Sequence, residues 1–99
     1  MASRFELVYE EDAETGLYAI CAYITENFYN HDAANKLYSK VIQRIELLRD
    51  FPEMCPVSYE NHRKCVIEHI VAIYHIDETN RQIVITDIVD GRTNYAPDF

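Results

Sequence analysis

The stretch Gln82–Val89, with the sequence QIVITDIV, constrains the fold of this chain more than any other segment. Isoleucine and valine dominate it, which favours an extended strand. Apolar residues stand at both odd and even positions, so both faces of the strand would be buried. This pattern predicts a strand in the interior of a sheet, with other strands on both sides.

Two earlier stretches have the spacing of amphipathic helices. The first is expected to have its N-cap at Asp12, and its apolar residues recur at helical spacing as far as Phe28. The second is expected to have its N-cap at Asp32 and to end just before Pro52, because proline disfavours helical geometry in the residue before it. The loop between them is short, so an antiparallel helical hairpin is predicted.

The other strand patterns are shorter. Phe5–Tyr9 alternates and is the expected first strand, and Pro56–Tyr59 is a short edge strand. His62–Ile76 is too long for one strand, and its alternation slips near Glu68-His69, which indicates a tight turn or a bulge. Asp77–Arg81 is the loop of a hairpin into the last strand. The order β-α-α-β-β-β predicts an α+β fold, with an N-terminal helical hairpin packed on a small, mainly antiparallel sheet.

The composition limits the classes of protein to consider. The chain has 99 residues and 48% of them are hydrophobic, which predicts one domain over residues 1–99 with one core. The formal net charge is −8, whereas phosphate contacts need Lys and Arg, so the charge counts against strong RNA or DNA binding but does not exclude a local basic site. The sequence shows no apolar signal core and no run long enough for a membrane span, so a cytoplasmic protein is predicted.

The cysteines and histidines give little indication of a ligand site. Cys21, Cys55 and Cys65 are odd in number and form no C-x-x-C pair, so reduced, mostly buried thiols are expected. The histidines lack ligand spacing on a helix, and the acidic N-terminal region lacks the spacing of a calcium loop. We therefore expect no metal and no other cofactor.

Tyrosine is unusually frequent. The chain has eight tyrosines and no tryptophan. Those on or near the predicted helices are expected to be half-buried packing residues, and they are Tyr18, Tyr23, Tyr29 and Tyr38. Tyr74 falls in a predicted core strand.

One group of charged and aromatic residues is a candidate site. His62, Arg63 and Lys64 are the only run of adjacent bases, and Arg92 and Tyr95 follow the turn after the last strand. A histidine beside two cations tends to stay neutral and can accept a proton near pH 7. In a small antiparallel sheet, the strand that begins at His62 and the turn after the last strand could bring these residues together on one face. Ordinary charged sheet edges have the same pattern, and the residues alone favour that plainer interpretation.

Short motifs in the second half follow one another in a characteristic order. They are Phe51-Pro52 after the helix pair, Arg63 opening a strand, Tyr74 near the end of the next, Asp77-Glu78 in the hairpin, Ile83–Val89 as last strand, and Gly91-Arg92 with Tyr95 after it. With the order β-α-α-β-β-β, this arrangement resembles the RelE/ParE superfamily of toxins from bacterial type II toxin–antitoxin modules. The resemblance covers nearly the whole chain.

RelE-like members of the superfamily cleave mRNA in the ribosomal decoding site. The reaction needs a proton acceptor, a proton donor and fixed positive charge, but no metal. The resemblance implies two arginines on the phosphate, a tyrosine that orients the base or transfers a proton, a histidine as base, and further substrate contacts. Here these residues would be Arg63 and Arg92, Tyr95, His62 or His69, and, as substrate contacts, Lys64 and His69. ParE-like members instead inhibit DNA gyrase by binding it.

Three departures from the RelE-like pattern favour the ParE-like alternative. The chain is acidic, Asp90 stands where a histidine usually precedes the glycine, and Thr93 replaces the second arginine of the motif. Each change weakens phosphate binding. A toxin that acts on a protein is therefore favoured over a ribosome-dependent nuclease, and a non-toxic, non-catalytic protein that only binds its partner is the second hypothesis.

The resemblance also implies a protein partner. Toxins of this superfamily are neutralised by a cognate antitoxin, whose flexible C-terminal segment wraps the toxin with a helix or adds a strand. The antitoxin supplies the DNA-binding domain of the pair, so direct DNA binding by this chain without its antitoxin is not expected. By the same resemblance, the expected roles are growth inhibition and plasmid stabilisation in a bacterium, with gyrase or the ribosome and its mRNA as target.

Overall fold

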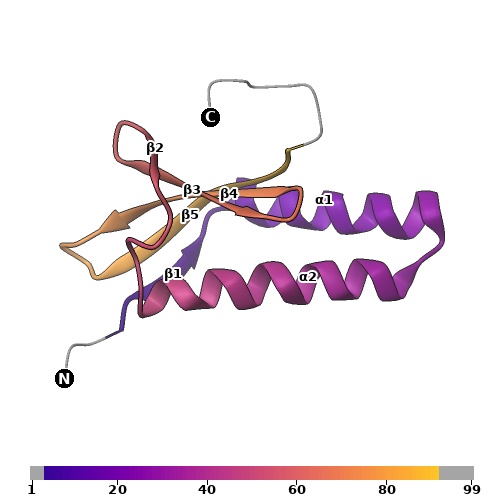
Figure 1. Cartoon of the computed structure of the whole chain (residues 1–99), viewed down its shortest axis with the longest axis horizontal. Helices are drawn as coiled ribbons and strands as arrows, with labels where there is room; N and C mark the ends of the chain where they lie inside the picture. The colour runs from indigo at the N-terminus through magenta and orange to yellow at the C-terminus, as the bar shows by residue number, and fades with distance from the viewer. Residues whose placement is uncertain (1–3, 92–99) are drawn as a thin grey trace.

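The chain forms a helical hairpin packed on a five-stranded sheet (Figure 1). The computed structural model describes residues 4–91. The helices are α1 (Glu11–Phe28) and α2 (His31–Glu46), and a short 3-10 turn, Leu47–Arg49, continues α2. In sheet order the strands are β1 (Glu6–Tyr9), β5 (Gln82–Asp90), β4 (Ile70–Asp77), β3 (His62–Ile67) and β2 (Val57–Tyr59).

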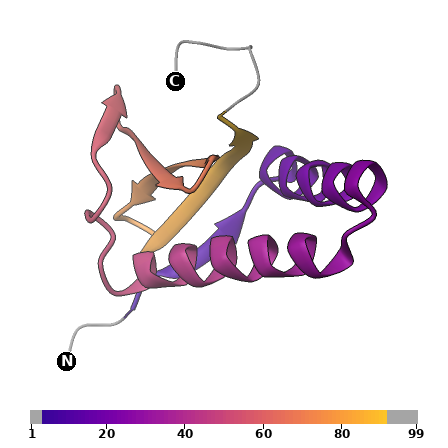
Figure 2. The same cartoon turned by 45° about the vertical axis from the view of Figure 1, so that its right-hand side comes forward.

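The strand pairing confirms the predicted α+β class. β1 and β5 are parallel, and the other three pairs are antiparallel. Figure 2 shows both helices against the twisted sheet, with the shorter strands β1 and β2 at its two edges. In the part of the chain that the structure describes, no helix is long and apolar enough to cross a membrane.

β5 lies in the interior of the sheet, as its sequence predicts. It pairs with β1 on one side and with β4 on the other. Ile83 and Val84 are neighbours on opposite faces of the strand, and their exposed fractions are 0% and 8%. Burial on both faces explains why this run is apolar at odd and even positions alike.

Gly16 allows α1 to approach β5 closely. A Cβ atom built at this position would collide with the carbonyl oxygen of Ile88 in β5. Ala13, Leu17 and Ile20, on the same side of α1, are buried in the core. The glycine therefore sets the distance between the helix and the sheet at this point.

The helix starts differ from the predicted ones. The N-cap of α1 is Glu10, so Asp12 lies inside the first turn, where negative charge is favourable. The N-cap of α2 is Asn30, whose side chain accepts a hydrogen bond from the Ala33 amide at 2.9 Å. Asp32 again lies within the first turn. Asparagine and aspartate cap about equally well, so propensity alone does not choose between them.

The turn between β3 and β4 falls where the sequence indicates it. Ile67 pairs with Ile70, which leaves Glu68 and His69 as a two-residue turn. Glu68 has φ 57°, in the left-handed region that tight hairpins require. The slip in the alternation thus marks a real hairpin and not a bulge.

The tyrosines of the helical hairpin are more exposed than predicted. Tyr18 and Tyr29 are 77% and 88% exposed, so the expectation of half-burial is wrong for both. Tyr23 and Tyr38 are about half covered, at 54% and 49% exposure. Smaller residues of the two helices fill the core instead, among them Ala13 and Ala34. Tyr74 of β4 is fully buried, as expected.

The expectation of reduced thiols is wrong for two of the three cysteines. Cys55 and Cys65 form a disulfide, with their Cα atoms 5.4 Å apart. The segment that follows Pro52 folds back over the start of β3, which brings together cysteines ten residues apart in the sequence. Cys21 is free, and burial raises its pKa.

We expect Gly16→Ala to lower the free energy of unfolding by about 1–3 kcal/mol, because the added methyl group must push α1 away from Ile88. This loss is the net effect that remains after the gain in helix propensity, which is at most about 1 kcal/mol. Thr15→Ala at the adjacent exposed position is the matched control and should be neutral or slightly stabilising. Urea unfolding of both variants measures the difference; equal stability would mean that the close contact is not needed.

Reduction should destabilise the chain. The disulfide closes a loop between residues ten apart, and the loss of such a crosslink costs about 2–3 kcal/mol. Thermal unfolding with and without a reductant measures the effect. The Cys55→Ser/Cys65→Ser variant should unfold at the same temperature as the reduced protein, with or without reductant. An unfolding temperature of the wild type that does not change with reductant would contradict the crosslink.

Candidate functional site

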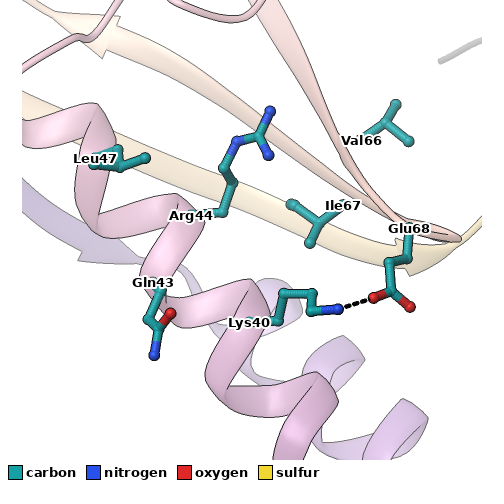
Figure 3. A pocket seen from close by; sticks show the side chains of 7 residues that line it. All are labelled: Lys40, Gln43, Arg44, Leu47, Val66, Ile67 and Glu68. Atoms are coloured by element: carbon teal, nitrogen blue, oxygen red, sulfur yellow. Dashed lines mark hydrogen bonds and ion pairs between the residues drawn. The ribbon is translucent and has the colours of Figure 1, made fainter.

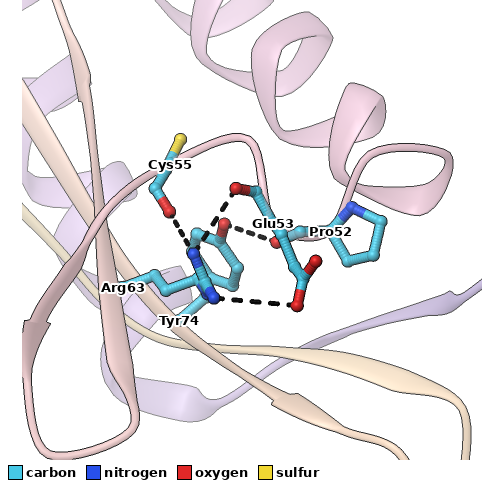
Figure 4. A network of polar contacts seen from close by, with 5 residues as sticks. All are labelled: Pro52, Glu53, Cys55, Arg63 and Tyr74. Atoms are coloured by element: carbon cyan, nitrogen blue, oxygen red, sulfur yellow. Dashed lines mark hydrogen bonds and ion pairs between the residues drawn. The ribbon is translucent and has the colours of Figure 1, made fainter.

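Arg63, the predicted phosphate ligand at the start of β3, is engaged by its own chain (Figure 4). Its Nη1 donates to the carbonyl oxygen of Cys55 at 2.7 Å and to that of Glu53 at 3.4 Å. Its Nη2 lies 3.9 Å from Oε2 of Glu53. The side chain is only 19% exposed. Most of the guanidinium is thus committed to the segment between Pro52 and Cys55.

Tyr74 supports the same segment from the neighbouring strand. Its hydroxyl donates to the carbonyl oxygen of Pro52 at 2.7 Å. Burial raises the pKa of the Tyr74 phenol, so the group stays protonated and remains a donor. Arg63 and Tyr74 are paired across β3 and β4, which explains why two motifs far apart in sequence act on one loop. We call these contacts, together with the Cys55–Cys65 disulfide, the loop clamp.

His62 lies on the other side of β3 from Arg63, because neighbours in a strand point to opposite faces. Its ring stacks on Tyr59, with centroids 5.0 Å apart, and meets the edge of His75 at 5.5 Å. Its Nδ1 is buried and has no hydrogen-bond partner among the described residues. The ring is held by packing against Tyr59 and His75, and it lies within electrostatic reach of Asp87 in β5.

Lys64 and His69 lie at different places along β3. The Lys64 amide donates to the Pro56 carbonyl at 3.1 Å, close to Arg63. His69 belongs to the turn at the other end of the strand, and its Nε2 is buried without a hydrogen-bond partner in the described chain. The structure therefore brings Lys64 near His62 and Arg63, and separates His69 from them.

Gly91 leaves the sheet beside His69. Its amide donates to the His69 carbonyl at 2.6 Å, and a Cβ atom here would lie 3.1 Å from the same oxygen. Its φ is not positive, so close approach and not a left-handed turn explains the glycine. The strand end that leads to Arg92 is thus fixed against the β3–β4 turn.

The start of β3 and the end of β5 lie at opposite ends of the sheet. His62 pairs with His75, whereas Asp90 pairs with Ile70, five residues earlier in β4. At about 3.3 Å per residue this separation is roughly 16 Å. Arg92 and Tyr95 lie outside the described residues, so their predicted convergence with Arg63 stays a prediction.

Acidic groups gather on β5 and the start of α1. Partial burial, then the charges of Asp12 and Glu10, raise the pKa of Asp87. Such a field disfavours a second anion nearby. Within residues 4–91, no group of three or more His, Cys, Asp or Glu side chains is placed to hold a metal ion.

A groove between α2 and β3 was not predicted from the sequence. Its volume is about 450 Å³, and it is lined by Lys40, Gln43, Arg44, Leu47, Val66, Ile67 and Glu68 (Figure 3). Lys40 and Arg44 are one helical turn apart, so both side chains reach one face of α2. That spacing was the only sequence signal, since β3 approaches this face only in the folded chain.

A protein-family model matches most of the chain. The family described as the ParE toxin of the type II toxin–antitoxin system, parDE, matches residues 7–95. No curated protein matches the sequence.

Solved structures match over most of the chain. A chain from the chromosomal ParDE toxin–antitoxin system of P. aeruginosa has a TM-score of 0.76 and 16% identity, covering 90% of this chain and 98% of that one. A chain from the RelBE2 toxin–antitoxin complex of Mycobacterium tuberculosis has a TM-score of 0.64 and 14% identity, covering 88% and 98%. At these identities the structures establish the fold, and the family follows from the sequence match over residues 7–95. The chain belongs to the ParE toxin family of type II toxin–antitoxin systems.

Proposed function

We propose that this chain is a toxin that arrests growth by binding a protein target, DNA gyrase, and that a cognate antitoxin neutralises it. One observation carries the choice of a protein target over mRNA. Arg63, the only arginine of the expected catalytic set within residues 4–91, is occupied by the loop clamp. A guanidinium that is 19% exposed and bonded to two carbonyls has little capacity left for a phosphate.

The acid–base groups support the same choice. Cleavage of mRNA needs a proton acceptor and a cation within hydrogen-bond reach of one phosphate. In the described chain His62 faces away from Arg63, and His69 lies at the far end of β3. The net charge of −8 adds a long-range repulsion of RNA.

The partner assignment rests on the family. Its description pairs the toxin with an antitoxin, and both structural relatives come from toxin–antitoxin assemblies. Arg92 and Tyr95 are our candidates for contacting the target, because they follow a strand end that is fixed beside His69. Cytoplasmic location in a bacterium and plasmid stabilisation belong to the same proposal.

Expression of the chain without an antitoxin should arrest bacterial growth. The purified protein should inhibit supercoiling by gyrase and leave mRNA on translating ribosomes uncut, because Arg63 is engaged by the loop clamp and His62 faces away from it. Cut mRNA with normal gyrase activity would contradict the choice of target. Growth without arrest would instead favour a non-toxic protein that only binds its partner.

Arg63→Ala should lower the stability of the protein, whereas Arg92→Ala should remove its toxicity. Removal of the Arg63 side chain leaves the Cys55 and Glu53 carbonyls without their donor, which should lower the free energy of unfolding by about 2 kcal/mol. Arg92→Ala should abolish growth arrest with little change in stability. Thermal unfolding and a growth assay on both variants separate the two effects. Full toxicity of Arg92→Ala would remove this residue from the proposed site.

A further inference from the structure

A second groove lies between α1 and α2, which run side by side in opposite directions (Figure 2). Two adjoining cavities form it, with volumes of about 560 and 330 Å³, and Tyr18, Cys21 and Tyr38 line both. Glu14 lines only the larger cavity and Glu26 only the smaller one. We call the two cavities together the helix groove. Their volumes fall within the range of small-molecule sites.

The middle of the helix groove is aromatic and open to solvent. Tyr18 of α1 is mostly exposed, and Tyr38 of α2 is about half exposed. Neither hydroxyl makes a hydrogen bond with another residue in 4–91. Between the two helices, the thiol of Cys21 donates to the carbonyl oxygen of Ala34 at 3.9 Å. The groove thus presents tyrosine rings, whose faces attract cations and whose apolar surfaces bind alkyl chains.

Tyr9, at the end of β1, adds a third ring to the larger cavity. Burial, then the charges of Glu46 and Tyr38, raise the pKa of Tyr9 to about 12, so its phenol is neutral at physiological pH. Glu46 also lies 3.7 Å from Nη1 of Arg49, so this carboxylate already has a cation beside it. Tyr9 therefore extends the neutral, aromatic wall of the groove.

A carboxylate stands toward each end of the helix groove. Glu14 and Glu26 are twelve residues apart on α1, which is roughly 18 Å along the helix axis. Neither carboxylate makes a hydrogen bond or an ion pair with another residue in 4–91. The described residues that line the groove include no lysine, arginine or histidine. The groove is therefore negative at both ends and largely apolar between them, which fits a long cation with an aliphatic chain.

We propose that the helix groove binds a linear aliphatic polyamine. The two terminal ammonium groups pair with Glu14 and Glu26, and the methylene chain lies across the rings of Tyr18 and Tyr38. An inner ammonium group lies over a ring face in a cation–π contact. A metal ion is a poor occupant, because no group of three or more His, Cys, Asp or Glu in residues 4–91 is placed to hold one. The site is distinct from the loop clamp and does not depend on whether the chain arrests growth.

Alkylation of Cys21 reports directly on occupancy of the helix groove. Cys21 lines both cavities and is the only free thiol, since the other two cysteines form the disulfide. Spermine at about ten times its dissociation constant should slow the reaction with iodoacetamide about tenfold, because only the unoccupied protein reacts. The tyrosine ring signals in NMR spectra give that dissociation constant.

Two further probes separate the sources of binding. Magnesium at equal ionic strength tests general attraction to an acidic protein, and octanediol tests the apolar groove without a charged ligand. Neither probe should protect Cys21. No protection by spermine or equal protection by magnesium would overturn the proposal. Equal protection by octanediol would also overturn it, and would identify an uncharged apolar occupant.

A comparison of two diamines tests the distance between the carboxylates. Diaminobutane and diaminododecane carry the same charge, but only the longer chain reaches both Glu14 and Glu26. The longer diamine should bind about tenfold more tightly or better, because its second ion pair forms within one complex. Equal binding of the two diamines would contradict the pairing of one ligand with both ends of the groove.

Matched variants test the two carboxylates. The Glu14→Gln/Glu26→Gln variant should weaken spermine binding about tenfold, since both terminal ion pairs are lost. The Glu11→Gln/Glu78→Gln variant makes the same charge change at exposed positions outside the groove, and should weaken binding less than about twofold. Equal effects of the two double variants would overturn the assignment of Glu14 and Glu26.

Variants of Tyr18 test the aromatic contact. Tyr18→Leu should weaken spermine binding about threefold or more, whereas Tyr18→Phe keeps the ring and should stay within about twofold of the wild type. Tyr23→Leu removes a ring from α1 that lines neither cavity and is the matched control. Both tyrosines are exposed, so the variants should fold. Equal loss in Tyr18→Leu and Tyr23→Leu, or in Tyr18→Leu and Tyr18→Phe, would overturn the cation–π contact.

Discussion

The backbone contact between Gly16 of α1 and Ile88 of β5 determines how the two layers meet. β5 pairs with β1 on one side and with β4 on the other, so it joins the N-terminal strand to the rest of the sheet. α1 rests on it, and α2 packs beside α1. The first residues of β5 pair in parallel with β1. At its other end, the amide of Gly91 donates a hydrogen bond to the carbonyl of His69 in the β3–β4 turn. A side chain larger than hydrogen at position 16 would disturb all of these contacts.

A second constraint acts on the segment after α2. Pro52, Glu53 and Cys55 have little regular structure, yet each is held by a contact to β3 or β4. The donors are Arg63 and Tyr74. The RelE-like interpretation assigns Arg63 to phosphate binding and gives Tyr74 no role. In this chain both residues hold the segment after α2 in place. The loop clamp fixes the path of the chain from the helices into the sheet, and the Cys55–Cys65 disulfide adds a covalent link.

The sequence predicts the fold well because each element has its own local signal. The run that is apolar on both faces predicts β5, and the helical spacing of apolar residues predicts α1 and α2. The slip in the alternation predicts the turn at Glu68. The candidate site is less predictable, because it depends on partners that only the fold brings together. Nothing local shows that Arg63 would meet the carbonyls of Cys55 and Glu53, or that Cys55 would pair with Cys65. The groove beside Arg44 cannot be seen in the sequence for the same reason, since α2 and β3 form it together only in the folded chain.

Recognition of protein and not of phosphate is the central claim. Titration of the chain with a fluorescent single-stranded RNA, at low salt and at about 0.15 M salt, tests it most directly. A phosphate-binding site gives saturable binding that falls steeply as salt rises, with a slope near 0.7 per phosphate contacted. With Arg63 occupied and a net charge of −8, we predict no saturable binding at either salt concentration. Saturable binding that is lost between the two concentrations would contradict this account.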